Sequence, residues 1–177
     1  MKLENHLGGH CGVTHVDTGT LSMLKEHGIK TMYDVGCGPG GMISAAHKIG
    51  LDCVGIDGDY TLNYPSNLTV KIHDFTTGPV DVEERDACWS CEFLEHVEEK
   101  YLDNIFSVFC KTKMVVCTAS ETPGGHHHVN LKDRNYWIVE FNKRGFEYNK
   151  HLTQLLVDQT TMHRDFVKNT GMVFTKK

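Results

Sequence analysis

The stretch from Thr31 to Gly41, TMYDVGCGPGG, constrains the fold of this chain more than any other. It joins a short apolar run that ends in an acid to a glycine-dense turn, and the helical pattern of residues 42–46 begins at once. Glycine leaves such a turn without side chains, so a ligand can approach the backbone N–H groups and the positive end of the helix dipole. The sequence therefore predicts a strand–turn–helix unit that binds a nucleotide-type ligand, rather than a turn that needs glycine only for its geometry.

The length and charge of the chain limit what can surround this unit. With 177 residues the chain fits one domain, 1–177, in which residues 1–30 form an arm and a helix and residues 31–177 form the core. The formal net charge of −5 gives no basic composition for broad binding to nucleic acid or to anionic membranes. No stretch has signal-peptide or membrane-span character, which predicts a cytoplasmic protein without membrane contact.

Seven cysteines are spread through the chain, and several lie inside apolar strand patterns. An odd number in that setting predicts reduced core thiols rather than a disulfide framework. Cys88 and Cys91 form an isolated C-x-x-C, but residues three apart on an extended run point to opposite faces of a sheet. This pair is therefore not expected to form a zinc or redox site.

Strand and helix patterns alternate after the glycine turn. Strands are predicted at Asp52–Asp57, Leu68–Ile72, Asp86–Ser90, Met114–Cys117, Phe146–Asn149 and Met172–Phe174. Helices are predicted up to Ile49, over Tyr101–Phe109, over Tyr136–Phe141 and over about Leu152–Val167. The alternation predicts an α/β fold with a mostly parallel sheet and helices on both of its faces.

The segment before this core divides into two parts. Residues 1–16 carry three glycines and three histidines without periodicity, which predicts a mobile arm that can fold over the ligand. A short helix is predicted after the arm, with Asp17 or Thr20 as its N-cap and Gly28 as its stop.

The glycine spacing by itself fits two templates. Gly36, Gly38 and Gly41 satisfy the dinucleotide pattern G-x-G-x-x-G, whereas Gly36, Gly38 and Gly40 satisfy D-x-G-x-G-x-G with Asp34 as the acid. A second acid, Asp57, lies about 20 residues beyond Gly36, where such folds place a carboxylate that accepts hydrogen bonds from a ribose diol. Asp59 can share or replace that role.

Four motifs in one order, DVGCGPG, VGIDGD, HD and EFLEHV, resemble the class I S-adenosylmethionine (SAM) methyltransferases over about residues 31–177. The resemblance implies a single-domain Rossmann-like fold with a seven-stranded, mostly parallel sheet and an antiparallel last strand. It implies a SAM site in which the residues beside the methionine part are Asp34, Gly36, Cys37, Gly38 and Gly40. It also implies that Asp57, with Gly58, binds the ribose hydroxyls and that Asp74, with Phe75, lies at the adenine.

The run from Glu92 to His96 follows the fourth predicted strand and faces the crevice where an acceptor must lie. Glu95 and His96 are the predicted catalytic residues, with His96 as the base. The run also resembles the E-x-x-E-H motif of metal-dependent O-methyltransferases, such as the small-RNA 2′-O- and ubiquinone-biosynthesis enzymes. That resemblance implies a Mg²⁺ or Mn²⁺ site formed by Glu92, Glu95, His96 and one histidine among residues 126–128. His127 is the predicted ligand of these three. Metal-free members carry a similar Leu-Glu-His segment, so a site without a metal stays the alternative.

Together these features predict a SAM-dependent methyltransferase that moves a methyl group to an oxygen, or a nitrogen, of an unidentified acceptor. A small molecule, a sugar and a nucleic-acid end all fit an uncapped site. A catalytically silent SAM-fold binding module is the first alternative. A nicotinamide-dependent oxidoreductase is the second, although the length leaves no room for its usual substrate domain.

Overall fold

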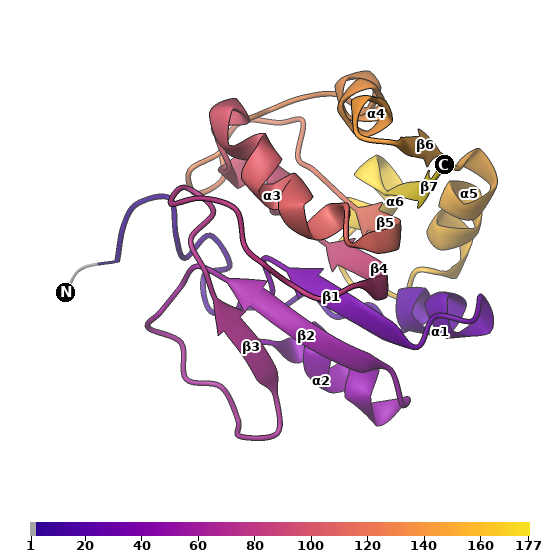
Figure 1. Cartoon of the computed structure of the whole chain (residues 1–177), viewed down its shortest axis with the longest axis horizontal. Coiled ribbons are helices and arrows are strands. Elements are labelled where there is room, and N and C mark those ends of the chain that lie inside the picture. Colours follow the sequence, from indigo (N-terminus) through magenta and orange to yellow (C-terminus); the bar gives the residue numbers. More distant parts are fainter. Residues whose placement is uncertain (1–2) are drawn as a thin grey trace.

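A computed structural model describes residues 3–177, where seven strands form one sheet with helices on both faces (Figure 1). The strands are β1 (Thr31–Val35), β2 (Asp52–Asp57), β3 (Thr69–Ile72), β4 (Arg85–Ser90), β5 (Thr112–Cys117), β6 (Phe146–Tyr148) and β7 (Met172–Lys176). The α-helices are α1 (Thr18–Glu26), α2 (Gly41–Lys48), α3 (Leu102–Phe109), α4 (Arg134–Lys143), α5 (Lys150–Gln159) and α6 (Phe166–Thr170). Two short 3₁₀ helices, η1 (Leu94–His96) and η2 (Glu99–Tyr101), follow β4.

The strand order is β3-β2-β1-β4-β5-β7-β6. Strands β1 to β5 pair in parallel, while β7 is antiparallel to both of its neighbours, β5 and β6. This topology confirms the predicted α/β sheet with an antiparallel last strand. The order reverses between β1 and β4, so the loops after these two strands diverge and leave a crevice at the carboxyl edge of the sheet.

Two apolar clusters fill the two sides of the sheet, because successive strand residues point to opposite faces. Tyr33 and Val35 pack with α3 and α4 on one face, where Phe141 stacks on Phe174 with ring centroids 3.8 Å apart. Met32 packs on the other face with α1, α2 and α5. Cys88 lies in the first cluster and Cys91 against the second, so the C-x-x-C pair is split across the sheet as predicted. All seven thiols are free.

The predicted helix over Leu152–Val167 is wrong, because the chain forms two helices there. Helix α5 ends at Gln159, and α6 begins at Phe166. The turn between them is held by Asp17, whose Oδ1 accepts a hydrogen bond from the Thr161 amide at 3.0 Å. This contact joins residues 144 positions apart in the sequence, so no local pattern could indicate it.

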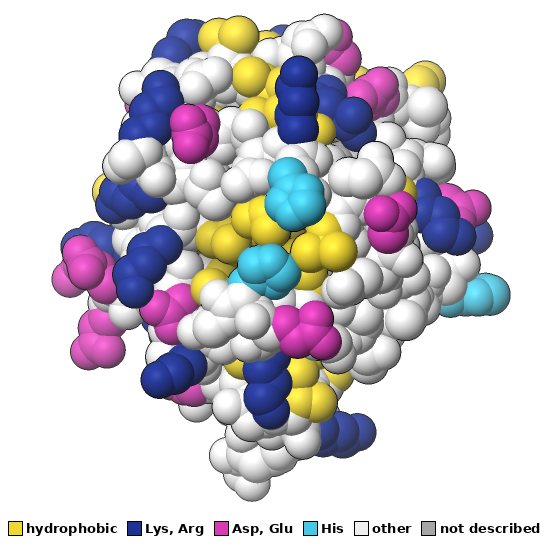
Figure 2. Space-filling view, turned by 90° about the vertical axis from the view of Figure 1, so that its right-hand side faces the viewer, with side chains coloured by type: hydrophobic (Ala, Val, Ile, Leu, Met, Phe, Trp, Pro, Cys, Tyr) yellow, Lys and Arg dark blue, Asp and Glu magenta, His cyan; other side chains and the backbone are white. Residues whose placement is uncertain are grey.

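Asp17 also begins α1, since its carboxylate accepts a hydrogen bond from the Thr20 amide at 3.0 Å. Of the two N-caps predicted for this helix, the structure selects Asp17. No helix within residues 3–177 has the length and apolar character needed to cross a membrane. On the face shown in Figure 2, Lys and Arg side chains are interspersed with Asp and Glu side chains around a small apolar patch.

Candidate active site

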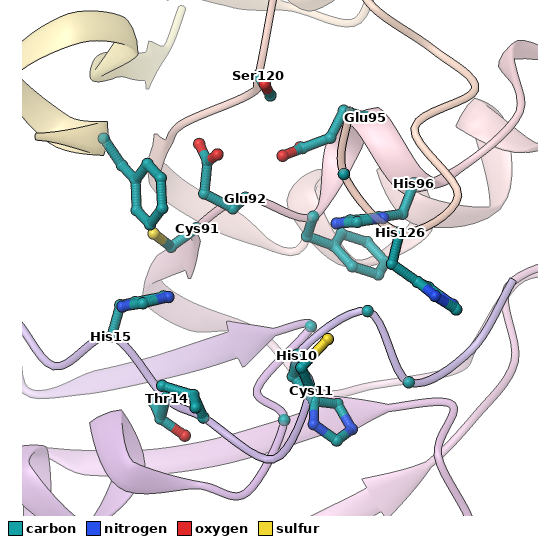
Figure 3. A pocket seen from close by; sticks show the side chains of 18 of the residues that line it. His10, Cys11, Thr14, His15, Cys91, Glu92, Glu95, His96, Ser120 and His126 are labelled. Atoms are coloured by element: carbon teal, nitrogen blue, oxygen red, sulfur yellow. The ribbon is translucent and has the colours of Figure 1, made fainter. Parts of the chain in front are cut away.

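A cavity of about 650 Å³ opens at the carboxyl edge of the sheet, between the loops that follow β1, β2, β4 and β5. This volume lies in the range of small-molecule binding sites. The N-terminal arm, residues 3–16, forms an opposing wall. In Figure 3, Glu92 and Glu95 reach inward from one side, and His10 and His15 lie on the other.

Asp34, at the carboxyl half of β1, is a buried acid that lines this cavity. It is 2 % exposed, and its Oδ2 accepts no hydrogen bond from any described residue. Burial, and then repulsion by Asp57, raise the pKa of Asp34 to about 8. A buried carboxylate without a partner is costly unless a cation reaches it. The α-ammonium group of the methionine part of SAM is such a cation, so the geometry suits the predicted role.

Asp57 ends β2 and also lines the cavity. Its two carboxylate oxygens accept hydrogen bonds from the Gly38 amide at 2.7 Å and the Asp59 amide at 2.8 Å. These bonds tie the glycine turn to the second strand and fix the direction of the carboxylate. Each oxygen keeps a second lone pair for a ligand hydroxyl.

Asp59 is less suited to the ribose role, although it was the predicted alternative. Its Oδ1 accepts hydrogen bonds from the amide and the hydroxyl of Thr61, and its Oδ2 contacts His10 Nε2 at 3.0 Å. It does not line the cavity, whereas Asp57 and Gly58 do. The structure therefore favours Asp57 over Asp59 for the ribose.

The glycine turn has no room for a side chain at Gly36, because the Phe93 ring lies against it. Gly36 has a φ of +76°, and a Cβ added there would lie 2.5 Å from Phe93 Cδ2. Both the backbone conformation and the space therefore require glycine at this position. Cys37 and Gly38 line the cavity with Gly36, whereas Gly40 is the N-cap of α2 and lies outside the cavity lining.

The predicted adenine residues, Asp74 and Phe75, lie apart from this main cavity. They line a smaller adjoining space of about 40 Å³, together with Gly58 and His96. Asp74 is engaged by the arm, because His6 Nε2 donates a hydrogen bond to its Oδ2 at 2.9 Å. The sequence placed these residues next to one ligand but could not show that the arm also contacts them.

Glu92 is held in place by Thr118 at the end of β5. The Thr118 hydroxyl accepts a hydrogen bond from the Glu92 amide and donates one to Glu92 Oε1, each at 2.8 Å. Glu92 has a φ of +49°, a left-handed conformation that costs about 1–3 kcal/mol for a residue with a side chain. This conformation turns the segment after β4 sharply into the η1 helix.

Glu95, His96 and His128 form a cluster whose ligand atoms all lie within 4.8 Å of one another. Neither carboxylate oxygen of Glu95 has a hydrogen-bond partner among the described residues, and His96 Nδ1 also has none. Burial, and then repulsion by Glu92, raise the pKa of Glu95 to about 8. Burial, and then the nearby His128, lower the pKa of His96 to about 4.

The histidine loop reaches this cluster because its end is bonded to η1. The amides of Val129 and Asn130 donate hydrogen bonds to the Glu95 carbonyl at 2.9 and 3.0 Å. His128 therefore lies edge-on against His96, with ring centroids 4.9 Å apart. His127, the histidine named as a ligand from the sequence, instead faces His6 at a centroid distance of 6.3 Å and lies outside the cluster. His127 has a φ of +50°, which turns the loop between these two side chains.

Glu92 is the second predicted ligand outside this cluster. Burial raises the pKa of Glu92 despite its bond from Thr118, and Glu92 and Glu95 both line the cavity. The group that could hold a metal ion is therefore Glu95, His96 and His128, and Glu92 lines the same cavity.

Several cavity residues were missed in the sequence. His15 contacts Phe166 edge-on at 5.0 Å, and both line the cavity with Arg164. His15 belongs to the arm, Arg164 precedes α6 and Phe166 begins it, so their proximity depends on contacts between distant segments such as that of Asp17 with Thr161. The glycines and histidines of the arm were the only local signal of a role at the ligand site.

The residues fit both groups that the resemblance implies. The unpartnered Asp34 and the glycine turn suit SAM, and the unpartnered carboxylate of Glu95 with two imidazoles suits a divalent cation. Buried polar atoms normally have partners, so these orphaned atoms at one cavity indicate ligands that complete them.

A methyltransferase-domain family matches residues 33–117 of the chain. No curated protein sequence matches it. The matched segment contains the glycine turn, Asp57, Asp74 and the run from Glu92 to His96.

Solved methyltransferase structures share the fold. A sugar N-methyltransferase, KedS8 from a Streptoalloteichus species, has a TM-score of 0.64 at 12 % identity, covering 89 % of this chain and 85 % of that one. A TehB-like SAM-dependent methyltransferase from Corynebacterium glutamicum has a TM-score of 0.62 at 18 % identity, covering 90 % and 88 %. The methyltransferase domain of bacterial CtHen1-C has a TM-score of 0.61 at 19 % identity, covering 90 % and 96 %. Residues 33–117 are thus similar to the methyltransferase-domain family, and the whole chain shares the Rossmann-like fold of solved SAM-dependent methyltransferases.

Proposed function

We propose that this protein transfers the methyl group of SAM to an oxygen of its acceptor, and that Glu95, His96 and His128 bind a divalent cation beside that oxygen. The observation that carries the proposal is one cavity with two sets of unpartnered polar atoms. Asp34 lies at the cofactor strand β1, and the cluster of Glu95 and His96 lies past β4.

The chain's own residues position the reactants. Asp34 binds the ammonium group of the cofactor, and Asp57 binds its ribose hydroxyls. When bound, SAM supplies an activated methyl group, so alignment of the acceptor accounts for most of the catalysis that the protein must add. The loops after β4 and β5 hold that acceptor, since their residues line the part of the cavity beside Glu95.

The geometry favours His96 as a metal ligand over His96 as a lone base. A ligand imidazole must be neutral, and the burial of His96, with His128 beside it, lowers its pKa and keeps it so. A base with a pKa of about 4 accepts a proton poorly at neutral pH. A bound Mg²⁺ or Mn²⁺ would lower the pKa of a coordinated hydroxyl, which suits an oxygen acceptor better than an amine.

An extract assay tests this function in two steps. The protein is incubated with methyl-labelled SAM and a small-molecule or nucleic-acid fraction of a cell extract, and the labelled product is isolated. We expect transfer that chelator abolishes and that added Mg²⁺ or Mn²⁺ restores. Transfer that resists chelation would support the methyltransferase activity and contradict the metal site. His96→Ala would then test His96 as the base.

Cofactor titrations separate the alternatives. S-adenosylhomocysteine should bind, while NAD(P) should not, which would exclude the nicotinamide-dependent oxidoreductase. Binding of S-adenosylhomocysteine without transfer to any fraction would favour the catalytically silent module.

A further inference from the structure

The N-terminal arm runs along the carboxyl edge of the sheet, over the ends of the strands that face the cofactor (Figure 1). It enters both the main cavity and the small adenine-side space, because His6 and Leu7 line both. The arm is therefore part of the cofactor site before any cofactor is bound.

His6 holds the acid that the cofactor resemblance assigns to adenine. Its Nε2 donates a hydrogen bond to Asp74 Oδ2 at 2.9 Å, and the two side chains are 26 % and 24 % exposed. Burial by itself would raise the pKa of Asp74, but the bonds from His6 and Thr76 lower it overall. His6 therefore occupies one of the two lone pairs of Asp74 Oδ2 that a donor on adenine could use.

Leu7 fills the space beside that acid. A Cβ added at Gly58 would collide with Leu7 Cδ2, so the leucine lies directly on the backbone after β2. The remaining space beside Asp74 and Phe75 is about 40 Å³, far below the volume of the main cavity.

The next part of the arm is anchored separately. The Gly12 amide donates a hydrogen bond to His10 Nδ1 at 2.9 Å, which leaves the proton of the neutral ring on Nε2. That Nε2 donates to Asp59 Oδ2 at 3.0 Å. Two glycines, Gly8 and Gly9, lie between this anchor and Leu7, and Gly8 has a φ of +77°.

We propose that His6 and Leu7 form a plug that the adenosine moiety of the cofactor displaces, by a swing about Gly8 and Gly9 while His10 stays on Asp59. The proposal rests on SAM as the cofactor. Because the arm covers the site in the free protein, only the fraction of molecules with the plug released binds cofactor, and the apparent affinity is reduced by that fraction.

Displacement of His6 and Leu7 would also affect the histidine loop, residues 126–128, on the acceptor side of the cavity. His126 Nε2 donates a hydrogen bond to the Leu7 carbonyl at 3.1 Å, and a Cβ added at Gly9 would lie 3.0 Å from His96 Cε1. Displacement of Leu7 therefore releases a contact on the histidine loop. Cofactor binding is thus expected to loosen the loop that borders the acceptor.

The first test is calorimetric titration of S-adenosylhomocysteine into the full chain and into a His6→Ala, Leu7→Ala double variant. We expect the double variant to bind about threefold to tenfold more tightly. His151→Ala, an exposed histidine on α5 away from the cavity, is the control and should bind as the wild type does. Equal or weaker binding by the double variant would overturn the plug and indicate that the arm is a lid that contacts the cofactor.

Hydrogen exchange on the wild-type chain gives a second readout that does not depend on a variant. The Leu7 amide donates to the Glu4 carbonyl, and the Val13 amide donates to the His10 carbonyl. Saturating S-adenosylhomocysteine should speed exchange in the peptide around Leu7 and leave the peptide around Val13 unchanged. Slower exchange around Leu7 would contradict the plug. A wild type that binds no S-adenosylhomocysteine would instead contradict the proposed cofactor.

Discussion

His128 lies edge-on against His96 at a centroid distance of 4.9 Å, although the two residues are 32 positions apart in the sequence. The bonds from Val129 and Asn130 to the Glu95 carbonyl hold the loop in this position. Of the three consecutive histidines, the fold therefore brings His128 into the cluster with Glu95 and His96, whereas His127 faces His6.

This arrangement predicts different effects for two adjacent substitutions. His128→Ala should weaken Mn²⁺ binding about 10-fold or more, because it removes a ligand atom, and His127→Ala should change it little. Titration of Mn²⁺ followed by electron paramagnetic resonance measures both. Equal losses in the two variants, or Mn²⁺ binding by neither variant nor wild type, would contradict the metal site.

Asp57→Asn should weaken S-adenosylhomocysteine binding at least about tenfold. A hydrogen bond to a charged group is worth roughly 1.5–3 kcal/mol, and the amide keeps only one acceptor oxygen for the Gly38 and Asp59 amides and the ribose. Calorimetry on the variant and on Asp158→Ala, an exposed acid of α5, gives the comparison. Unchanged affinity would show that Asp57 serves only the turn.

Asp34 should make stability depend on pH. Its pKa in the folded protein, about 8, exceeds the usual value of 3.8, so the folded state keeps a proton that the unfolded state releases. The free energy of unfolding therefore falls as pH rises between these values. Asp34→Asn cannot ionise, so thermal unfolding should show the variant gaining stability relative to wild type from about pH 5 to about pH 8. A difference that is constant with pH would mean that Asp34 is ionised throughout.

Asp34 should also make cofactor binding depend on pH, but here the affinity should rise with pH whereas the stability falls. Only the ionised carboxylate attracts the ammonium group, so S-adenosylhomocysteine should bind more tightly to wild type as pH rises toward about 8. The Asp34→Asn variant should bind more weakly and lose this part of the pH dependence. Parallel pH profiles for the two proteins would exclude Asp34 as the ammonium partner.

Gly36→Ala should destabilise the protein by about 2–5 kcal/mol. The left-handed backbone costs about 1–2 kcal/mol with a side chain, and collision with Phe93 adds about 1–3 kcal/mol. Gly50→Ala is the matched control, since Gly50 has a φ of +81° with nothing within 4 Å of an added Cβ. Urea unfolding should show a larger loss at Gly36, and equal losses would mean that Phe93 moves away at no cost.

The sequence alone determined the strands and the cofactor motifs, because each depends on residues close together in the chain. Short apolar runs bounded by turn residues located every strand, and β2 matches its predicted bounds. The glycine spacing predicted the turn after β1, because glycine is favoured where the backbone adopts a positive φ. The acids after β2 and β3 follow from the same logic, since parallel strands end at one edge.

Only the tertiary structure decided which of these residues meet. The arm over Asp74, the choice of His128 over His127, and the division of the last predicted helix all depend on hydrogen bonds between distant segments. Such bonds form only after the sheet has placed its loops at a common edge, and their partners carry no periodic pattern. The sequence therefore predicted which kinds of residue form the site, whereas the tertiary structure determined which of them lie together.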